Sequence, residues 1–401
     1  MTVKKWNIKL LPPSFSSWSP KKPHSKQIAV LMSGGVDSSV AAHLLMEHGW
    51  DVLGITMKIP ASRSVTARSR RRSIAMATER CCGADAAFVC NELNIPHYFV
   101  DVTEAFQQLI IDPFRQSYAK GHTPNPCADC NTLLKFSLVW DFLEKTFGIS
   151  YLATGHYARV RWTKEEGRQT IRKHSSLVNR PSSLVTLARA KDKTKDQSYF
   201  LYGITREKLE RFVLPLGELT KQQVRSIAAQ LNLSVADKAE SMELCFAGEG
   251  DYRAALNTAE ADQPGDIRDM RGSKLGTHKG IANYTLGQRR GIGFAGGLPL
   301  YVGKIDAKTN TIALGTREQV STRTIRANQI NVLMAEELAV DNKIFGKIRS
   351  YGVLQPCKVI KVGQSDVTVE FDEPQFAPCP GQKLVLYDSD DNIVAGGTIK
   401  D

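Results

Sequence analysis

The chain has 401 residues, of which 42% are hydrophobic and 23% charged, a composition typical of a globular protein with two or three domains. It contains no apolar run of about 18 residues, so we expect no membrane association. Lysine and arginine outnumber aspartate and glutamate by 53 to 41, a formal net charge of +12. Much of the excess lies in two blocks, 63–80 and 159–195, each of which taken alone is equally typical of a solvated loop.

The first 26 residues contain six lysines and no acidic residue. They lack the apolar core of a signal peptide, and a transit peptide is normally richer in arginine. We therefore expect a disordered basic tail over 1–26 and a cytoplasmic protein, with an organelle address as the alternative. The eight cysteines are then expected to be reduced, and to serve metal binding or catalysis in preference to structural disulfides.

The first predicted strand covers 28–32, and a glycine- and serine-rich turn separates it from a helix near 38–48. Backbone N–H groups and the positive helix end make such a turn a phosphate site. The turn has neither the lysine of G-x-x-x-x-G-K-[ST] nor the G-x-G-x-x-G pattern. Its sequence, SGGVDSS at 33–39, instead resembles the PP-loop of ATP pyrophosphatases, which cleave ATP between the α- and β-phosphates. A turn without a ligand is the alternative.

The pattern after this turn alternates between strands and helices. We predict strands at 52–57, 97–100 and 151–154 and helices at 84–93, 104–119 and 132–147. This rhythm predicts an α/β fold with a doubly wound parallel sheet. Ligands of such sheets bind at the carboxyl ends of the strands, so Gly34, Met57 and Gly155 are expected to converge on one pocket.

Two further domains are expected after this one. Thr220 and Gln223 have the spacing of a capping box at the start of a helix, within a predominantly helical stretch. From about 265 onward, short alternating strands and glycine turns predict an antiparallel barrel or sandwich. We therefore predict a catalytic domain over 27–204, a small helical connector over 205–264 and a β-barrel domain over 265–401.

Four more stretches carry chemical residue types. They are GHTPNPCADCNTLLKF at 121–136, LATGHYAR at 152–159, KDQSYFLY at 195–202 and ESMELCFAGEGDYRAAL at 240–256. Cys127 and Cys130 precede a predicted helix, whose dipole and backbone donors stabilise a thiolate. Joined to a nucleotide site, the basic blocks favour a polyanionic partner such as RNA.

Taken with SGGVDS and the YTLGQRRGIG run at 284–293, these stretches resemble the tRNA-specific 2-thiouridylases from about residue 27 to the C-terminus. The resemblance implies ATP with Mg²⁺ as a cofactor, tRNA as the substrate and a sulfur donor protein, either a cysteine desulfurase or a sulfur carrier. It also implies that Cys245 receives sulfur as a persulfide and that Cys130 is the second catalytic thiol.

The same resemblance implies the binding residues. Those expected to hold ATP are Ala29, Val30, Leu31, Met32, Ser33, Gly34, Gly35, Val36, Asp37, Ser38, Met57 and Gly155. Those expected to contact the target base are Asn125, Pro126 and Cys127, and those expected to contact tRNA are Lys195, Asp196, Gln197, Arg349 and Ser350.

The chain departs from the family pattern at two places. Many members carry aspartate where Cys127 stands, and Arg-Tyr where Arg349 and Ser350 stand. Cys127, Cys130 and Cys245 offer three thiolates, a set that can hold a [4Fe–4S] cluster with one open iron. The persulfide and cluster routes both stay open at this point.

Two other classes of function compete with this interpretation. A PP-loop ligase that forms an amide or guanidino bond would need no paired cysteines. An RNA-binding module without catalysis would be expected to have lost Asp37 or Cys245, and both are present.

Overall fold

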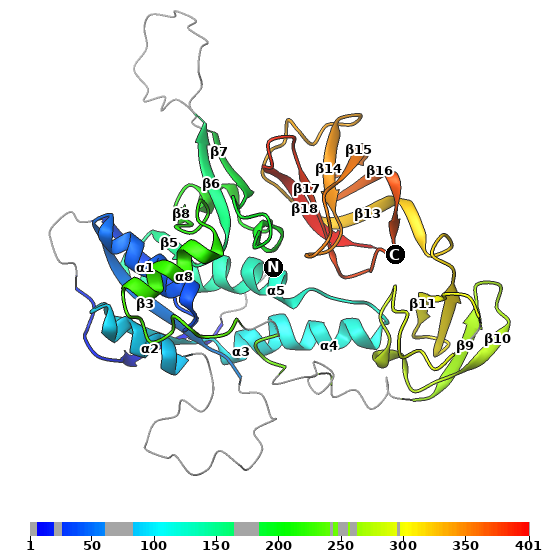
Figure 1. Ribbon diagram of the computed structural model, residues 1–401, viewed down its shortest axis with the longest axis horizontal. Coiled ribbons are helices and arrows are strands. Elements are labelled where there is room, and N and C mark those ends of the chain that lie inside the picture. The colour runs from blue at the N-terminus through cyan, green and yellow to red at the C-terminus, as the bar shows by residue number, and fades with distance from the viewer. Residues whose placement is uncertain are drawn as a thin grey trace, which may run out of the picture.

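The computed structural model describes residues 6–19, 26–60, 83–163, 184–240, 244–247, 256, 263–294 and 297–400. Figure 1 shows an α/β unit joined to two β units, with the last strands close to the green hairpin of the α/β unit. The arginine block at 63–80 and the middle of the 159–195 block lie outside the described residues. Within the described part, no helix is both long and apolar enough to cross a bilayer.

The α/β unit is built on a six-stranded sheet with the order β1-β4-β3-β2-β5-β8. Five strands are parallel: β2 (Lys26–Leu31), β3 (Trp50–Lys58), β4 (His97–Asp101), β5 (Tyr151–Thr154) and β8 (Phe212–Val213). The predicted doubly wound parallel sheet is confirmed. Its central strands are apolar because both of their faces are covered.

Side chains of β2 alternate between the two faces. Ile28 and Val30 pack in one cluster with α1 (Val36–Glu47) and α2 (Gly83–Glu92), whereas Ala29 packs in the cluster on the other side. All the helical segments between β4 and β5 belong to that second cluster, namely α3 (Thr103–Phe106), η2 (Gln107–Ile111), α4 (Asp112–Ala119), α5 (Pro126–Asp129), η3 (Cys130–Val139) and α6 (Trp140–Phe147). The segments η2 and η3 are π-helical insertions, which are rare and concentrate at functional sites.

The prediction of a disordered tail over 1–26 is wrong for residues 9–13, which form the strand β1 (Lys9–Pro13). This strand pairs antiparallel with β4 at the edge of the sheet, with Leu10 opposite Val100. The reason is local composition: Ile8, Leu10 and Trp18 supply apolar side chains that pack against the core, and these outweigh the flanking lysines.

Between the sheet and the C-terminal half lie a β-hairpin and short helices. The hairpin consists of β6 (Ala158–Thr163) and β7 (Leu184–Arg189), and it is followed by η4 (Ser198–Phe200), α7 (Arg206–Leu209) and α8 (Lys221–Gln230). The capping box of Thr220 and Gln223 is present at the start of α8. Val224 and Ala228 of α8 pack in the same cluster as α1.

The C-terminal part contains two β units. A four-stranded sheet with the order β10-β9-β12-β11 comprises β9 (Gly265–Asp269), β10 (Lys274–His278), β11 (Tyr301–Asp306) and β12 (Thr311–Gly315), with η7 (Ile281–Asn283) after β10. The closed antiparallel barrel comprises β13 (Ser321–Val332), β14 (Lys343–Lys347), β15 (Gln355–Val362), β16 (Asp366–Phe376), β17 (Lys383–Tyr387) and β18 (Ile393–Ile399). The predicted C-terminal barrel is confirmed. The boundaries at 204/205 and 264/265 stay predictions.

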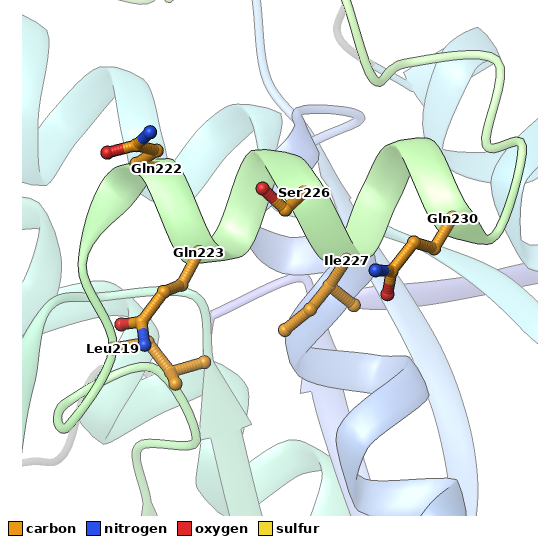
Figure 2. A pocket seen from close by; sticks show the side chains of 6 residues that line it. All are labelled: Leu219, Gln222, Gln223, Ser226, Ile227 and Gln230. Carbon is orange, nitrogen blue, oxygen red and sulfur yellow. The ribbon is translucent and has the colours of Figure 1, made fainter.

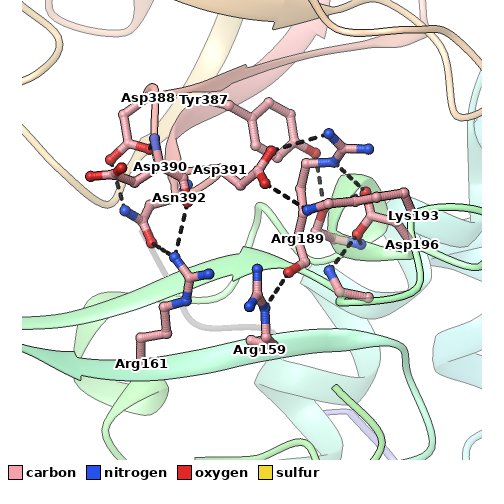
Figure 3. A network of polar contacts seen from close by, with 12 residues as sticks. Arg159, Arg161, Arg189, Lys193, Asp196, Tyr387, Asp388, Asp390, Asp391 and Asn392 are labelled. Carbon is pink, nitrogen blue, oxygen red and sulfur yellow. Dashed lines mark hydrogen bonds and ion pairs between the residues drawn. The ribbon is translucent and has the colours of Figure 1, made fainter. Parts of the chain in front are cut away.

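A polar network joins the barrel to the hairpin (Figure 3). Arg189 of β7 donates to Asp196 at 3.0 Å and to Asp391, in the β17–β18 turn, at 3.1 Å. Asp391 also accepts from Lys193 at 2.6 Å, and Arg161 donates to the carbonyl oxygen of Asp390 at 2.9 Å. The Asp196 side chain is only 1% exposed, so its charge depends on Arg189 and on nearby N–H and O–H donors.

Arg189→Met should therefore lower the free energy of unfolding by about 3 kcal/mol, because it removes the cation that donates a hydrogen bond to the buried Asp196 carboxylate. Lys193→Met removes an exposed ion pair to the same turn and should cost less than about 1 kcal/mol. Urea denaturation of both variants measures the difference. Equal costs would contradict the buried-charge explanation.

Candidate functional site

The turn between β2 and α1 is a concave, donor-rich loop. Gly34 has a φ of +70°, a conformation that glycine adopts without strain. The Ser38 hydroxyl lies 3.1 Å from the Ser33 hydroxyl and 3.2 Å from the Ser33 backbone nitrogen, and it also donates to the Gly35 carbonyl oxygen at 3.1 Å. Gly35 is the N-cap of α1 and contributes no side-chain cap. Backbone N–H groups at the N-terminus of α1 therefore remain for an anion.

The turn after β5 packs directly on this loop. A Cβ atom on Gly155 would lie 2.6 Å from the backbone nitrogen of Ser38 and 2.7 Å from the carbonyl carbon of Asp37. No side chain fits at such distances, so Gly155 allows the two turns to touch. The strands β2 and β5 are neighbours in the sheet, which brings their carboxyl ends together as expected from the sequence.

Asp37 is the centre of a charged cluster. Its carboxylate accepts from the Lys221 ammonium at 2.7 and 2.8 Å and from the Tyr157 hydroxyl at 2.8 Å. Burial, followed by the neighbouring Asp37 charge, raises the pKa of Tyr157, which therefore stays a protonated donor. Lys221 is 9% exposed and comes from the first position of α8.

Glu240 extends the cluster away from the loop. It lies 2.9 Å from Lys221 and 2.9 Å from Lys195, and these two partners hold its pKa below the usual value. A second lysine, Lys238, donates to the carbonyl oxygen of Gly34 at 2.8 Å and pairs with Asp85 of α2. The turn between β2 and α1, which we call the phosphate loop after its predicted ligand, is thus flanked by Lys221 at the start of α8 and by Lys238 in the segment after α8.

The cysteine segment starts at a capped helix. The Asn125 side chain accepts from the Ala128 backbone N–H at 3.1 Å, and Pro126 occupies the first position of α5. Cys127 is exposed and Cys130 is buried. The helix therefore places one thiol at the surface and the other beneath it.

Burial raises the pKa of the Cys130 thiol to about 11. Partial desolvation by the surrounding protein also raises the pKa of Cys127, although that residue reaches the surface. The thiolate stabilisation expected from the helix N-terminus is thus outweighed, because desolvation is the larger effect at a buried thiol. Lys135 acts in the opposite direction on both cysteines. Its ammonium is held by the Asn131 side chain at 2.9 Å, within the π-helical segment η3.

The turn after β5 also contacts the continuous helical segment formed by α5 and η3, which we call the cysteine helix. The His156 ring lies 6.4 Å from the Phe136 ring, centroid to centroid, and its Nδ1 is 2.8 Å from the Thr154 hydroxyl. Burial, followed by the Lys135 charge, lowers the pKa of His156 to about 3. This imidazole is therefore neutral at physiological pH and fits a positioning role.

The barrel braces the cysteine segment from the other side. Gln382 donates to the carbonyl oxygens of Thr123 and Pro124 at 3.1 and 3.3 Å. Lys383 of β17, only 3% exposed, donates to Asp129 at 2.6 Å. These contacts join residues more than 250 positions apart in the chain.

Cys245 is exposed in a short turn over residues 244–247. Its neighbour Phe246 is buried and packs edge-on against Phe106 and Phe114, at ring distances of 5.8 and 5.3 Å. Among the described residues, no group of three or more histidine, cysteine or carboxylate side chains is arranged to hold a metal ion.

Four of the five residues expected to contact tRNA bind other residues of this chain. Asp196 and Gln197 bind within the chain: Asp196 holds Arg189, and the Gln197 side chain accepts from the Tyr157 backbone N–H at 2.9 Å. Lys195 pairs with Glu240, and the Arg349 guanidinium donates to the carbonyl oxygens of Phe376 and Ala377. Ser350 is half-buried on the loop after β14, next to Tyr351, which is 85% exposed.

Sequence reasoning missed several polar residues here, namely Tyr157, Lys221, Lys238, Glu240 and Lys135. A signal existed for Lys221, because the capping box puts it at the first position of a helix, where a cation opposes the dipole. A groove on one face of α8 (Figure 2) is lined by Leu219, Gln222, Gln223, Ser226, Ile227 and Gln230. These six side chains include no thiol or ionisable group, so the groove is not the chemical site.

Fold and site together define a HUP-type nucleotide-binding domain that carries two β domains. The family model described as tRNA methyl transferase HUP domain matches residues 26–249. The tRNA methyl transferase PRC-barrel domain matches residues 253–316, and the Aminomethyltransferase beta-barrel domain matches residues 322–399.

Curated relatives match almost the whole chain. The tRNA-specific 2-thiouridylase MnmA 2 of Thermoanaerobacter sp. (strain X514) is 39% identical over 384 residues, covering 94% of this chain and 98% of the relative. MnmA of Pelotomaculum thermopropionicum is 39% identical over 381 residues, covering 93% and 97%. MnmA 1 of Caldanaerobacter subterraneus subsp. tengcongensis is 40% identical over 384 residues, covering 94% and 98%. The chain therefore belongs to the tRNA-specific 2-thiouridylase family.

Gly155→Ala should weaken ATP binding by about tenfold while the protein stays folded, because the added methyl forces the phosphate loop to shift at an overpacking cost of about 1–3 kcal/mol. Gly276→Ala is the matched control, since a Cβ there meets nothing within 4 Å. Equilibrium titration with an ATP analogue measures both. Unchanged affinity of Gly155→Ala would contradict this location of the phosphates.

Proposed function

We propose that this chain is a tRNA-uridine 2-sulfurtransferase that replaces O2 of the wobble uridine of tRNA with sulfur at the expense of ATP. One observation supports this most directly: a single turn, Thr154–Gly155–His156, touches both the phosphate loop and the cysteine helix. ATP activation and sulfur chemistry can therefore share one substrate base. Family membership favours this function over a PP-loop ligase or a non-catalytic RNA-binding module.

In the first step, O2 of the uracil attacks the α-phosphorus of ATP, and pyrophosphate leaves. The proposed ATP residues are the loop from Ala29 to Ser38, together with Met57 and Gly155 beside the adenosine. The carboxylate of Asp37 suits Mg²⁺, a hard cation that takes oxygen ligands. Bound Mg²⁺ would neutralise the triphosphate and the leaving pyrophosphate.

In the second step, sulfur replaces the adenylated oxygen. The terminal sulfur of a Cys245 persulfide attacks C2 of the base, and AMP leaves with its oxygen. The Cys130 thiolate then attacks the Sγ of Cys245, and the electron pair of the broken S–S bond stays on the new 2-thiouridine. Two thiols are thereby oxidised to a disulfide, so an external thiol reductant must restore them before the next turnover.

The high pKa of Cys130 fits its late role in this sequence. A buried thiol with a pKa of about 11 is mostly protonated at neutral pH, and so is protected from adventitious oxidation. The Lys135 ammonium favours the Cys130 thiolate. The uracil base is neutral and supplies no further cation for this thiolate. We propose Lys135 as the group that stabilises the thiolate when Cys130 attacks.

The target base is proposed to lie against Asn125, Pro126 and Cys127, and tRNA to contact Lys195, Asp196, Gln197, Arg349 and Ser350. Asp196 and Gln197 are turned into the protein, so their proposed effect on tRNA is to position the loop that carries Lys195. The net charge of +12 favours the polyanionic substrate. A cysteine desulfurase or sulfur carrier is the proposed sulfur donor, and the cytoplasm the proposed location.

We propose the persulfide route in place of an iron–sulfur cluster. Cys127, Cys130 and Cys245 are suitable ligands by chemistry, but they are not arranged as a three-ligand metal group in the described residues. The described arrangement therefore does not fit a [4Fe–4S] cluster. Cys127 in this proposal is a contact of the base.

The function is tested with [α-³²P]ATP, tRNA and a persulfide donor. The expected products are labelled AMP and pyrophosphate, with 2-thiouridine in the digested tRNA. Cys130→Ser should still adenylate the base but release no free 2-thiouridine, because the persulfide bond is not broken. Labelled ADP in place of AMP would contradict the proposal.

Cys127→Asp separates the two sulfur routes. The persulfide route predicts that this variant keeps substantial thiolation activity in air, because aspartate stands at this position in many family members. Activity and iron content are measured after anaerobic reconstitution with iron and sulfide. Loss of thiolation together with loss of bound iron, with adenylation intact, would favour the cluster, since carboxylate is a poor ligand for iron–sulfur centres.

A further inference from the structure

Lys221 lies where electrostatics disfavours a cation. It occupies the first position of α8, a helix of ten residues with no acidic residue in its first turn. The positive end of the helix dipole repels an ammonium group there. The side chain is also largely buried, at 11% exposure, so its charge requires close anionic partners.

The partners of Lys221 account for all three ammonium protons. Two hydrogen bonds go to the two oxygens of Asp37, at 2.7 and 2.8 Å, and the third contact is to Glu240 at 2.9 Å. Two backbone N–H groups at this helix end already have partners: that of Gln223 donates to the Thr220 side chain and that of Lys221 to Asp192. The ammonium group is thus the donor that α8 directs at the phosphate loop.

We propose that Lys221 is a polyphosphate ligand, which releases Asp37 and binds the β- and γ-phosphates when ATP enters. This inference rests on the proposed function and adds a binding residue from outside the phosphate loop.

The charge balance of the cluster supports the exchange. Asp37 and Glu240 pair with Lys221 and Lys195, and the Asp192 carboxylate accepts from the Lys221 backbone N–H beside them, so these groups carry no excess positive charge without a ligand. A cation bound by Asp37 would compete with Lys221 for the same carboxylate and repel it. The triphosphate is then the anion within reach of the displaced ammonium, because Asp37 is in the first turn of the helix whose N-terminus faces the loop.

Tyr157 contacts both Asp37 and Lys221, and so lies beside the ammonium group before and after the proposed exchange. Its hydroxyl donates to Asp37 at 2.8 Å, and its ring lies 5.8 Å from the Lys221 ammonium. Asp37 therefore keeps one protein donor after Lys221 leaves. The lysine moves along the face of a buried ring, which stabilises its charge during the exchange.

The test compares Lys221→Met with Lys221→Arg in the full-length chain. We expect Lys221→Met to weaken binding of α,β-methylene ATP with Mg²⁺ by about tenfold or more, and Lys221→Arg to keep it within about threefold, because a charge-assisted phosphate contact is lost or kept. Adenosine should bind the wild type and both variants equally. Lys208→Met is the matched control: this lysine is 13% exposed and pairs with Asp141, away from the phosphate loop.

The alternative explanation predicts the opposite change in affinity for α,β-methylene ATP. If Lys221 only neutralises Asp37, Lys221→Met frees that carboxylate for Mg²⁺, and affinity for the analogue stays equal or rises; this overturns the proposal. A variant that binds neither adenosine nor the analogue has lost the whole nucleotide pocket. In that case a labelling experiment on the wild-type protein tests the proposal. An acyl phosphate of ATP should acylate Lys221 in the wild type, with protection by ATP. Labelling of Lys238 but not Lys221 overturns the proposal.

The proposed function can fail separately. Wild-type enzyme in the same buffer must form 2-thiouridine in tRNA. If it forms none but shows the lysine-dependent affinity and labelling, the activity is wrong and the phosphate contact stands.

Discussion

The neighbouring positions of β2 and β5 in the parallel sheet are the constraint on which the site depends. Because parallel strands present their carboxyl ends at one edge, the phosphate loop after β2 and the turn after β5 must meet there. Gly155 makes that meeting possible at backbone contact distance. His156, one residue on, then lies against the helix that carries Cys130. Three consecutive residues, Thr154, Gly155 and His156, thus connect the loop after β2 with the segment that carries Cys130.

The barrel contacts this site directly, through residues that are far from it in the sequence. Gln382 and Lys383 hold the segment around Asn125 and Asp129, and Arg189 links the hairpin to the β17–β18 turn. Lys383 is nearly inaccessible, so its pair with Asp129 is a fixed element and not a mobile surface contact. The helical segment that carries Cys127 and Cys130 is therefore braced by residues near the C-terminus of the chain.

Much of this arrangement could be predicted from local pattern. The strands and helices of the parallel sheet, the capping box at Thr220 and the late β-strands all follow from apolar periodicity and turn residues. The N-terminal strand β1 could not, because five residues at a sheet edge are stabilised by pairing with β4 and by apolar contacts, and the surrounding lysines conceal the signal.

The site divides in the same way. Sequence by itself predicted the glycine- and serine-rich loop between the first strand and helix and singled out the pair Cys127 and Cys130, because each depends on residues a few positions apart. Only the tertiary structure decided that burial raises the pKa of Cys130, and that Lys221 and Lys383 reach Asp37 and Asp129. Desolvation and ion pairing depend on what surrounds a group in space. Those surroundings come from segments 184 and 254 positions away, a separation that no local pattern encodes.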